Sequence, residues 1–161
     1  MIIGIQCKLG KDKNYHLNKT IECEKAGYRL IHIFEHEWIN KQEIIKSKLK
    51  ALFCVEQTKI YARKCIIKEI STDIKNEFLN QFHIQGEDKS KVKLGLFFVD
   101  ELVAVMTFGK PRFNKNYEYE LIRYATSKHV IGGASKLLKY FERVYKPKSI
   151  ITYADRCYSQ R

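Results

Sequence analysis

The stretch Lys93-Leu-Gly-Leu-Phe-Phe-Val-Asp-Glu-Leu-Val-Ala-Val-Met-Thr107 decides the fold of the larger part of this chain. Two apolar runs flank the polar pair Asp100-Glu101, a pattern that predicts two antiparallel strands joined by a hairpin. The apolar side chains of this hairpin must be buried, so we expect helices to pack against the sheet that contains it.

The segments on either side supply further strands and helices. Ser71-Thr-Asp73 predicts a capped helix over residues 74–82, and Pro147 follows a second apolar-periodic stretch. The predicted elements are a strand at 59–70, the helix at 74–82, the hairpin, a strand at 118–125, a helix at 132–145 and a strand at 149–154. This order predicts an α+β fold around an antiparallel sheet with packed helices.

The N-terminal third reads differently, as a short α-β-α arrangement. An amphipathic helix is expected over residues 11–26, ending at Gly27, followed by a buried strand over 28–34. A second helix is expected over 41–53, with Asn40 as its cap and Glu43 three residues later. We place a boundary near residues 55–60, which gives parts 1–55 and 59–161.

Net charge and composition limit the classes of molecule that this chain is expected to bind. The 161 residues carry a net charge of +12, and residues 110–161 hold 12 Lys and Arg against 4 Asp and Glu. Such a basic region predicts a polyanion partner, although a lysine-rich solvated surface is the alternative. No 18-residue apolar stretch occurs, so we expect a soluble, cytoplasmic protein without membrane contact. The five dispersed cysteines predict reduced thiols rather than a zinc site.

Gly27-Tyr-Arg-Leu-Ile-His-Ile-Phe-Glu-His-Glu-Trp38 carries the first candidate site. If the segment is extended, Glu35 and Glu37 lie on one face and can share one Mg²⁺ or Mn²⁺. His16 and Lys19 lie one helical turn apart, as a candidate base and a phosphate-neutralising cation. The alternative is a solvated strand end whose glutamates pair with nearby lysines.

Together with Asn14-Tyr-His-Leu-Asn-Lys-Thr20, this segment resembles the second half of the very-short-patch-repair-type endonuclease fold of phage homing endonucleases. The resemblance implies a metal-dependent DNA nuclease with Glu35, Glu37, His16 and Lys19 as catalytic residues. The earlier hairpin with an Asp ligand has no counterpart in the sequence. We therefore expect a chain shortened at both ends that is missing a catalytic Asp.

His129-Val-Ile-Gly-Gly-Ala134 stands between a predicted strand and a helix, where glycines allow backbone N–H groups to approach a phosphate. With Leu102-Val-Ala-Val-Met-Thr-Phe-Gly-Lys-Pro111, Tyr119-Glu-Leu-Ile-Arg-Tyr124 and Thr152-Tyr-Ala-Asp-Arg156, it resembles GCN5-related N-acetyltransferases and the Mom-type proteins. The resemblance implies cofactor contacts at His129, Gly132, Gly133 and Ala134. Because His129 replaces the usual Arg or Gln, we expect no acetyl-CoA binding.

These features lead to one hypothesis and two alternatives. The hypothesis is a phage homing-endonuclease-like protein that binds duplex DNA in the cytoplasm of an infected bacterium, either as a metal-dependent endonuclease or as its impaired remnant. The expected DNA contacts are Lys110, Arg112, Lys136, Lys139 and Arg143. The alternatives are a non-catalytic inhibitor that binds a host or phage protein in an anti-defence role, and an acyl-CoA-dependent acyltransferase.

Overall fold

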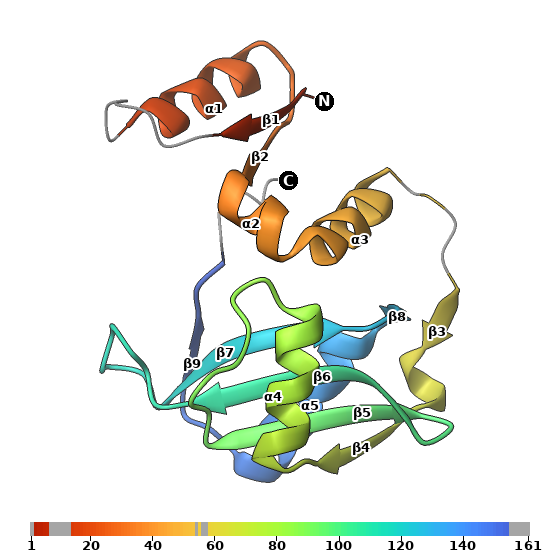
Figure 1. Cartoon of the computed structure of the whole chain (residues 1–161). Helices are drawn as coiled ribbons and strands as arrows, with labels where there is room; N and C mark the ends of the chain where they lie inside the picture. The colour runs from red at the N-terminus through yellow and green to blue at the C-terminus, as the bar shows by residue number, and fades with distance from the viewer. Residues whose placement is uncertain (1, 7–13, 54, 56–57, 155–161) are drawn as a thin grey trace. The chain divides into compact units, whose positions relative to one another are not determined.

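The computed structural model describes residues 2–6, 14–53, 55 and 58–154 (Figure 1). They form two compact units, one with the described residues of Met1–Ser47 and Ala154, the other Lys48–Tyr153. The predicted α+β class is confirmed, since helices pack against a five-stranded, mostly antiparallel sheet. No helix among the described residues is both long and apolar enough to cross a membrane.

The first unit contains a parallel pair of strands connected through a helix. Strand β1 (Ile2–Gln6) pairs with β2 (Leu30–Phe34), and α1 (Tyr15–Lys25) connects them. Helix α1 confirms the predicted helix over 15–25, while residues 11–13 lie outside the described residues. The chain leaves α1 through Gly27 at φ +77°, the left-handed geometry expected after a helix. Strand β1 was not predicted, because residues 2–6 give too short a pattern.

Two helices follow β2 directly. Helix α2 (Glu35–Asn40) was not predicted, and α3 (Gln42–Leu52) confirms the helix expected over 41–53. The predicted capping role of Asn40 is wrong. Asn40 is the last residue of α2, and its Nδ2 donates to the carbonyl of His36 at 2.8 Å. The Asn40 side chain therefore bonds to the preceding turn of α2 and does not cap α3.

The second unit is built on a five-stranded sheet of order β4-β5-β6-β7-β9. Its strands are β4 (Ile66–Glu69), β5 (Val92–Phe98), β6 (Glu101–Gly109), β7 (Tyr119–Thr126) and β9 (Ile150–Thr152). Neighbours run antiparallel, except that β9 runs parallel to β7. The predicted hairpin is confirmed, with Val99 and Asp100 as the turn residues, both at positive φ.

Helices α4 (Thr72–Phe82) and α5 (Gly133–Tyr145) cover opposite faces of this sheet (Figure 1). The predicted cap of α4 is confirmed, since the Ser71 hydroxyl accepts from the Ile74 N–H at 3.3 Å. On the other face, Phe141 of α5 stacks on Phe108 of β6 with ring centroids 3.6 Å apart. Aromatic stacking and the buried Leu137 fix α5 in its position on the sheet.

The prediction of one strand over residues 59–70 is wrong. The segment forms β3 (Lys59–Tyr61), a short 3-10 helix η1 (Ala62–Lys64) and then β4. Strand β3 pairs in parallel with β8 (His129–Ile131), not with the main sheet. Because β8 leads into α5, this pairing brings η1 next to the first turns of α5. The break in the strand therefore creates the surface described next.

Cys23 and Cys65 are free thiols, and Cys7, Cys54 and Cys157 lie outside the described residues. Burial raises the pKa of the Cys65 thiol, an effect that nearby Lys136 opposes. Cys65 is therefore a protonated core residue at neutral pH.

Candidate nucleic-acid interface

The second unit has a cleft of about 580 Å³ between η1 and α5. Its apolar part includes Ile67 and Ile131, and two tyrosines, Tyr61 and Tyr140, add aromatic surface. The cationic lining residues are Arg63, Lys136, Lys139 and Arg143. A concave surface that combines aromatic rings with several cations is typical of sites for phosphate-bearing ligands.

The glycine turn sets where α5 begins. Gly132 caps the helix in the left-handed conformation at φ +75°. Gly133 is buried, and a Cβ there would lie 2.8 Å from the Tyr124 hydroxyl oxygen. The Ala134 backbone N–H bonds to Tyr124, whose pKa is raised to about 12, chiefly by burial. Tyr124 thus satisfies one of the free amides of the helix start, and Gly133 serves the packing beneath it.

Lys136 joins the two walls of the cleft. Its ammonium group donates to the carbonyl oxygen of Ala62 at 2.9 Å and to that of Cys65 at 2.5 Å. These bonds satisfy carbonyl groups of η1 and of the residue after it. Lys136 was predicted as a DNA contact, and the structure places it at the cleft with a structural role there.

Three other cations stand at the cleft with exposed side chains: Arg63, Lys139 and Arg143. The guanidinium carbon of Arg63 lies 5.2 Å from the centre of the Tyr61 ring. That of Arg143 lies 5.7 Å from the centre of the Tyr140 ring. Within the described part of the chain, no carboxylate forms an ion pair with any of the three. Their charge is available to an anion from outside.

The remaining predicted DNA contacts lie away from this lining. Arg112 is bound to the fully buried Glu120: its Nη2 and Nε donate to Oε1 at 2.6 and 2.8 Å, and its backbone N–H to Oε2 at 2.7 Å. Burial would raise the pKa of Glu120, but the Arg112 bonds and charge outweigh it and hold the pKa below its usual value. Arg112 thus neutralises a buried carboxylate. Lys110, just before it, is exposed.

Glu35 and Glu37 do not have the geometry predicted for them. Both lie in the first turn of α2, so the expectation of one extended face is wrong. Helix residues two positions apart point about 200° away from each other around the axis. Carboxylates are favourable at a helix N-terminus, which explains why the strand gives way to a helix at Glu35. No group of three His, Cys, Asp or Glu residues that could hold a metal occurs within the described ranges.

His16 lies in a small polar cluster of the first unit. The Thr20 hydroxyl donates to the His16 carbonyl at 2.9 Å and contacts Nε2 of His32 at 2.8 Å. Because its single proton is used on the carbonyl, Thr20 accepts from a protonated Nε2 of His32. Burial, then the nearby His16 and Lys19, lower the pKa of His32, so it is neutral at pH 7. His32 is thus a buried, neutral residue of β2.

His129 does not line the cleft. It lies on β8, paired with Lys59 of β3, and its side chain is exposed. Of the four residues predicted to hold a cofactor, Gly132 lines the cleft, Gly133 is buried against Tyr124 and Ala134 is exposed. The absence of acetyl-CoA binding stays a prediction.

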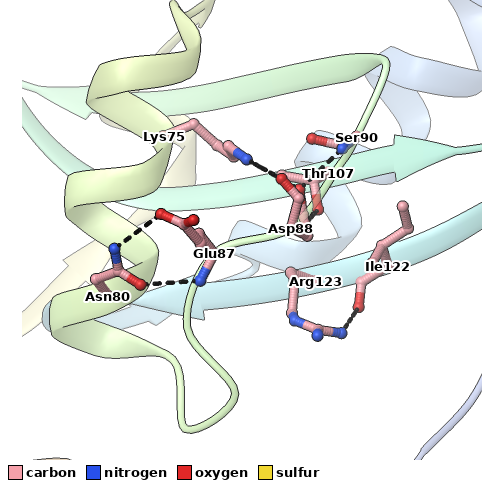
Figure 2. Close-up of polar contacts among 8 residues, drawn as sticks. All are labelled: Lys75, Asn80, Glu87, Asp88, Ser90, Thr107, Ile122 and Arg123. Atoms are coloured by element: carbon pink, nitrogen blue, oxygen red, sulfur yellow. Dashed lines mark hydrogen bonds and ion pairs between the residues drawn. The ribbon is translucent and has the colours of Figure 1, made fainter.

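Figure 2 shows a second polar cluster, on the α4 face of the sheet. The Lys75 ammonium donates to the Asp88 carbonyl at 2.5 Å and to Oδ1 at 3.1 Å. Thr107 donates to Oδ2 at 2.5 Å, and the Ser90 N–H donates to Oδ1 at 3.1 Å. Both carboxylate oxygens are thus satisfied internally. The cluster anchors the connection between α4 and β5 and is structural.

Sequence reasoning missed Arg63, Tyr61 and Tyr140 as residues of the cleft. The signal available was Tyr61-Ala-Arg63, an aromatic residue and a cation at the end of a short apolar run. Reading residues 59–70 as one strand hid it, because the strand model gives no reason for Arg63 to approach α5.

Comparisons with protein-family models, curated proteins and solved structures found no match to this chain.

Proposed function

We propose that this chain is a DNA-binding protein of the phage homing-endonuclease type, which contacts duplex DNA through the cleft between η1 and α5. The observation that carries the proposal is the convergence of Arg63, Lys139 and Arg143 around one hollow, without a carboxylate partner among the described residues. The sequence resemblance supplies the class of protein.

The charge of the chain supports the same partner. Lysine and arginine side chains gain affinity for DNA by displacing the cations condensed on its phosphates. Residues 110–161 carry an excess of eight positive charges, and α5 lies in that region. The positive end of the α5 dipole, at Gly132 and Ser135 of the cleft lining, adds to the attraction.

The proposal concerns binding and does not include cleavage. Glu35 and Glu37 point apart on α2, so a single ion cannot be held by both as it would be on a strand.

The test is a comparison of two charge-reversed variants with equal net charge. The first replaces the cleft cations: Arg63→Glu, Lys139→Glu and Arg143→Glu. The control replaces three exposed lysines that do not line the cleft: Lys89→Glu, Lys91→Glu and Lys148→Glu. Lys136 is left intact because it joins the cleft walls.

Fluorescence anisotropy with a labelled duplex at low salt measures affinity for all three proteins. We expect the cleft variant to lose at least about tenfold more affinity than the control. Equal losses in the two variants would show that the net charge, and not the cleft, binds DNA. Absence of binding by the unmodified chain would refute the proposal.

A further inference from the structure

The cleft is more apolar than contact with a duplex backbone requires. Duplex phosphates lie on the outside of the helix, and cations on an open surface are enough to bind them. Here the cations surround a hollow of about 580 Å³ whose surface includes Ile67, Ile131 and the rings of Tyr61 and Tyr140. An apolar, aromatic recess is suited to a planar base.

We propose that the cleft receives one unpaired nucleotide of a DNA strand. Its base stacks on the tyrosines, and its neighbouring phosphates are held by Arg63, Lys139 and Arg143. This inference rests on the proposed DNA-binding function and specifies which form of DNA the cleft prefers. Aromatic side chains bind any base in this way, so the preference is for structure and not for sequence.

The aromatic surfaces are held in place before a ligand arrives. Tyr61 is the β3 partner of Ile131 in the short parallel pair with β8, and 44% of its surface is exposed. Tyr140 packs against the main core from α5. Because Tyr61 lies on a paired strand and Tyr140 on a helix, a base loses little affinity to their ordering.

The cations are arranged for a strand more than for a free nucleotide. Lys139 and Arg143 lie four residues apart on α5, so they are one turn, about 6 Å, apart along the helix axis. Arg63 approaches from η1, on the other wall. Cations on two walls and along a helix can contact successive phosphates, whereas a mononucleotide offers a single phosphate group.

The experiment compares three labelled oligonucleotides of one sequence: a perfect duplex, the same duplex with one unpaired nucleotide, and the single strand. With the unmodified protein at constant salt, we expect the duplex with the unpaired nucleotide to bind about tenfold more tightly than the perfect duplex. Tenfold corresponds to about 1.4 kcal/mol, which lies within the range for stacking of one base on an aromatic ring.

Variants of cleft residues test whether the preference for the duplex with an unpaired nucleotide depends on the cleft. Tyr61→Ala should reduce the tenfold ratio between the two affinities to about one, whatever it does to binding of the perfect duplex, while Tyr61→Phe should keep the ratio. Ser135→Trp, which fills the exposed mouth of the cleft, should also abolish the advantage, with Ser135→Ala as its control. Ser135 is outside the core, so this variant tests the cleft independently of any folding effect at Tyr61. Thermal melting confirms that each variant is folded.

The outcomes separate this inference from the proposed function. If no oligonucleotide binds, both fail. If the perfect duplex binds through the cleft cations but the unpaired nucleotide gives no advantage, or the advantage survives both Tyr61→Ala and Ser135→Trp, only this inference fails. Competition by micromolar deoxyadenosine monophosphate as effective as competition by the strand would show a free-nucleotide pocket and would also overturn it.

Discussion

At the residue scale, the sheet unit depends on one buried ion pair and on one pair with a buried carboxylate and an exposed arginine, neither of which the sequence revealed. Lys75 and Asp88 have side-chain exposures of 1% and 3%, and Glu120 is fully buried beside Arg112. Each carboxylate receives several hydrogen bonds, which offset the cost of removing it from water. Such pairs fix the positions of segments that are distant in sequence.

Replacing Lys75 by Met should destabilise the sheet unit by about 3–5 kcal/mol, because Asp88 would remain buried without its cation. Urea unfolding followed by circular dichroism measures the change. The double variant Lys75→Met, Asp88→Asn should recover part of the loss, since it also removes the isolated charge. A loss below about 1 kcal/mol in the single variant would mean that the pair is not buried as described.

Acid should remove the contribution of this Asp88 cluster to the stability of the fold. Burial would raise the pKa of Asp88, but bonds from Thr107, Ser90 and Lys75 hold it below its usual value. A carboxyl whose folded pKa is depressed stabilises the fold above its unfolded pKa, about 3.9. This contribution is lost as the pH falls from there through the folded pKa.

Thr107→Val removes one of these bonds, so we expect its acid-unfolding midpoint to move to higher pH. The exposed turn residue Asp100 supplies the control, Asp100→Asn, which should leave the midpoint unchanged. A midpoint at lower pH in Thr107→Val would contradict the assignment of Asp88 as the titrating group.

At the element scale, the strands of the hairpin between β5 and β6 could be predicted from the sequence, but the position of its turn could not. Its two strands were predictable because two apolar runs and the polar break between them are local signals. The turn itself is one residue earlier than Asp100-Glu101, since Val99 belongs to it. An apolar Val99 looks like strand, and its positive φ of 47° is imposed by the register of the pair.

Val99→Asn should stabilise the sheet unit by about 1 kcal/mol, because Asn tolerates positive φ far better than a β-branched residue does. Val99 is 83% exposed, so the change costs little packing. Thermal unfolding should show a higher midpoint. Val99→Ile, which keeps the branched side chain, should give no increase, and an increase there equal to that of Val99→Asn would exclude relief of backbone strain as the cause.

Elements without a long pattern were the ones that sequence reasoning missed. Helix α2 has only six residues, and its charged start at Glu35 and Glu37 reads equally well as the end of a strand. Strand β3 pairs with β8, about 70 residues away, so the bend at η1 is a consequence of tertiary structure. Lys139 and Arg143 were predicted as members of a cationic surface from the helical spacing of α5, whereas Arg63 was missed because the bend at η1 was missed.

At the scale of the whole molecule, the net charge of +12 predicts a polyanion but not the place where it binds. The structure divides the basic residues by role. Arg112 and Lys136 are used in internal bonds, whereas Arg63, Lys139 and Arg143 stand exposed at one cleft. The DNA-binding account depends on this second group.

The most direct test is the salt dependence of duplex binding by the unmodified chain and by the variant Arg63→Ala, Lys139→Ala, Arg143→Ala. Each phosphate contact contributes about 0.9 to the slope of log affinity against log salt concentration. If the three cations contact phosphates, the variant's slope should be shallower by about 2.7. An unchanged slope would contradict the account, because DNA would then be bound by other residues.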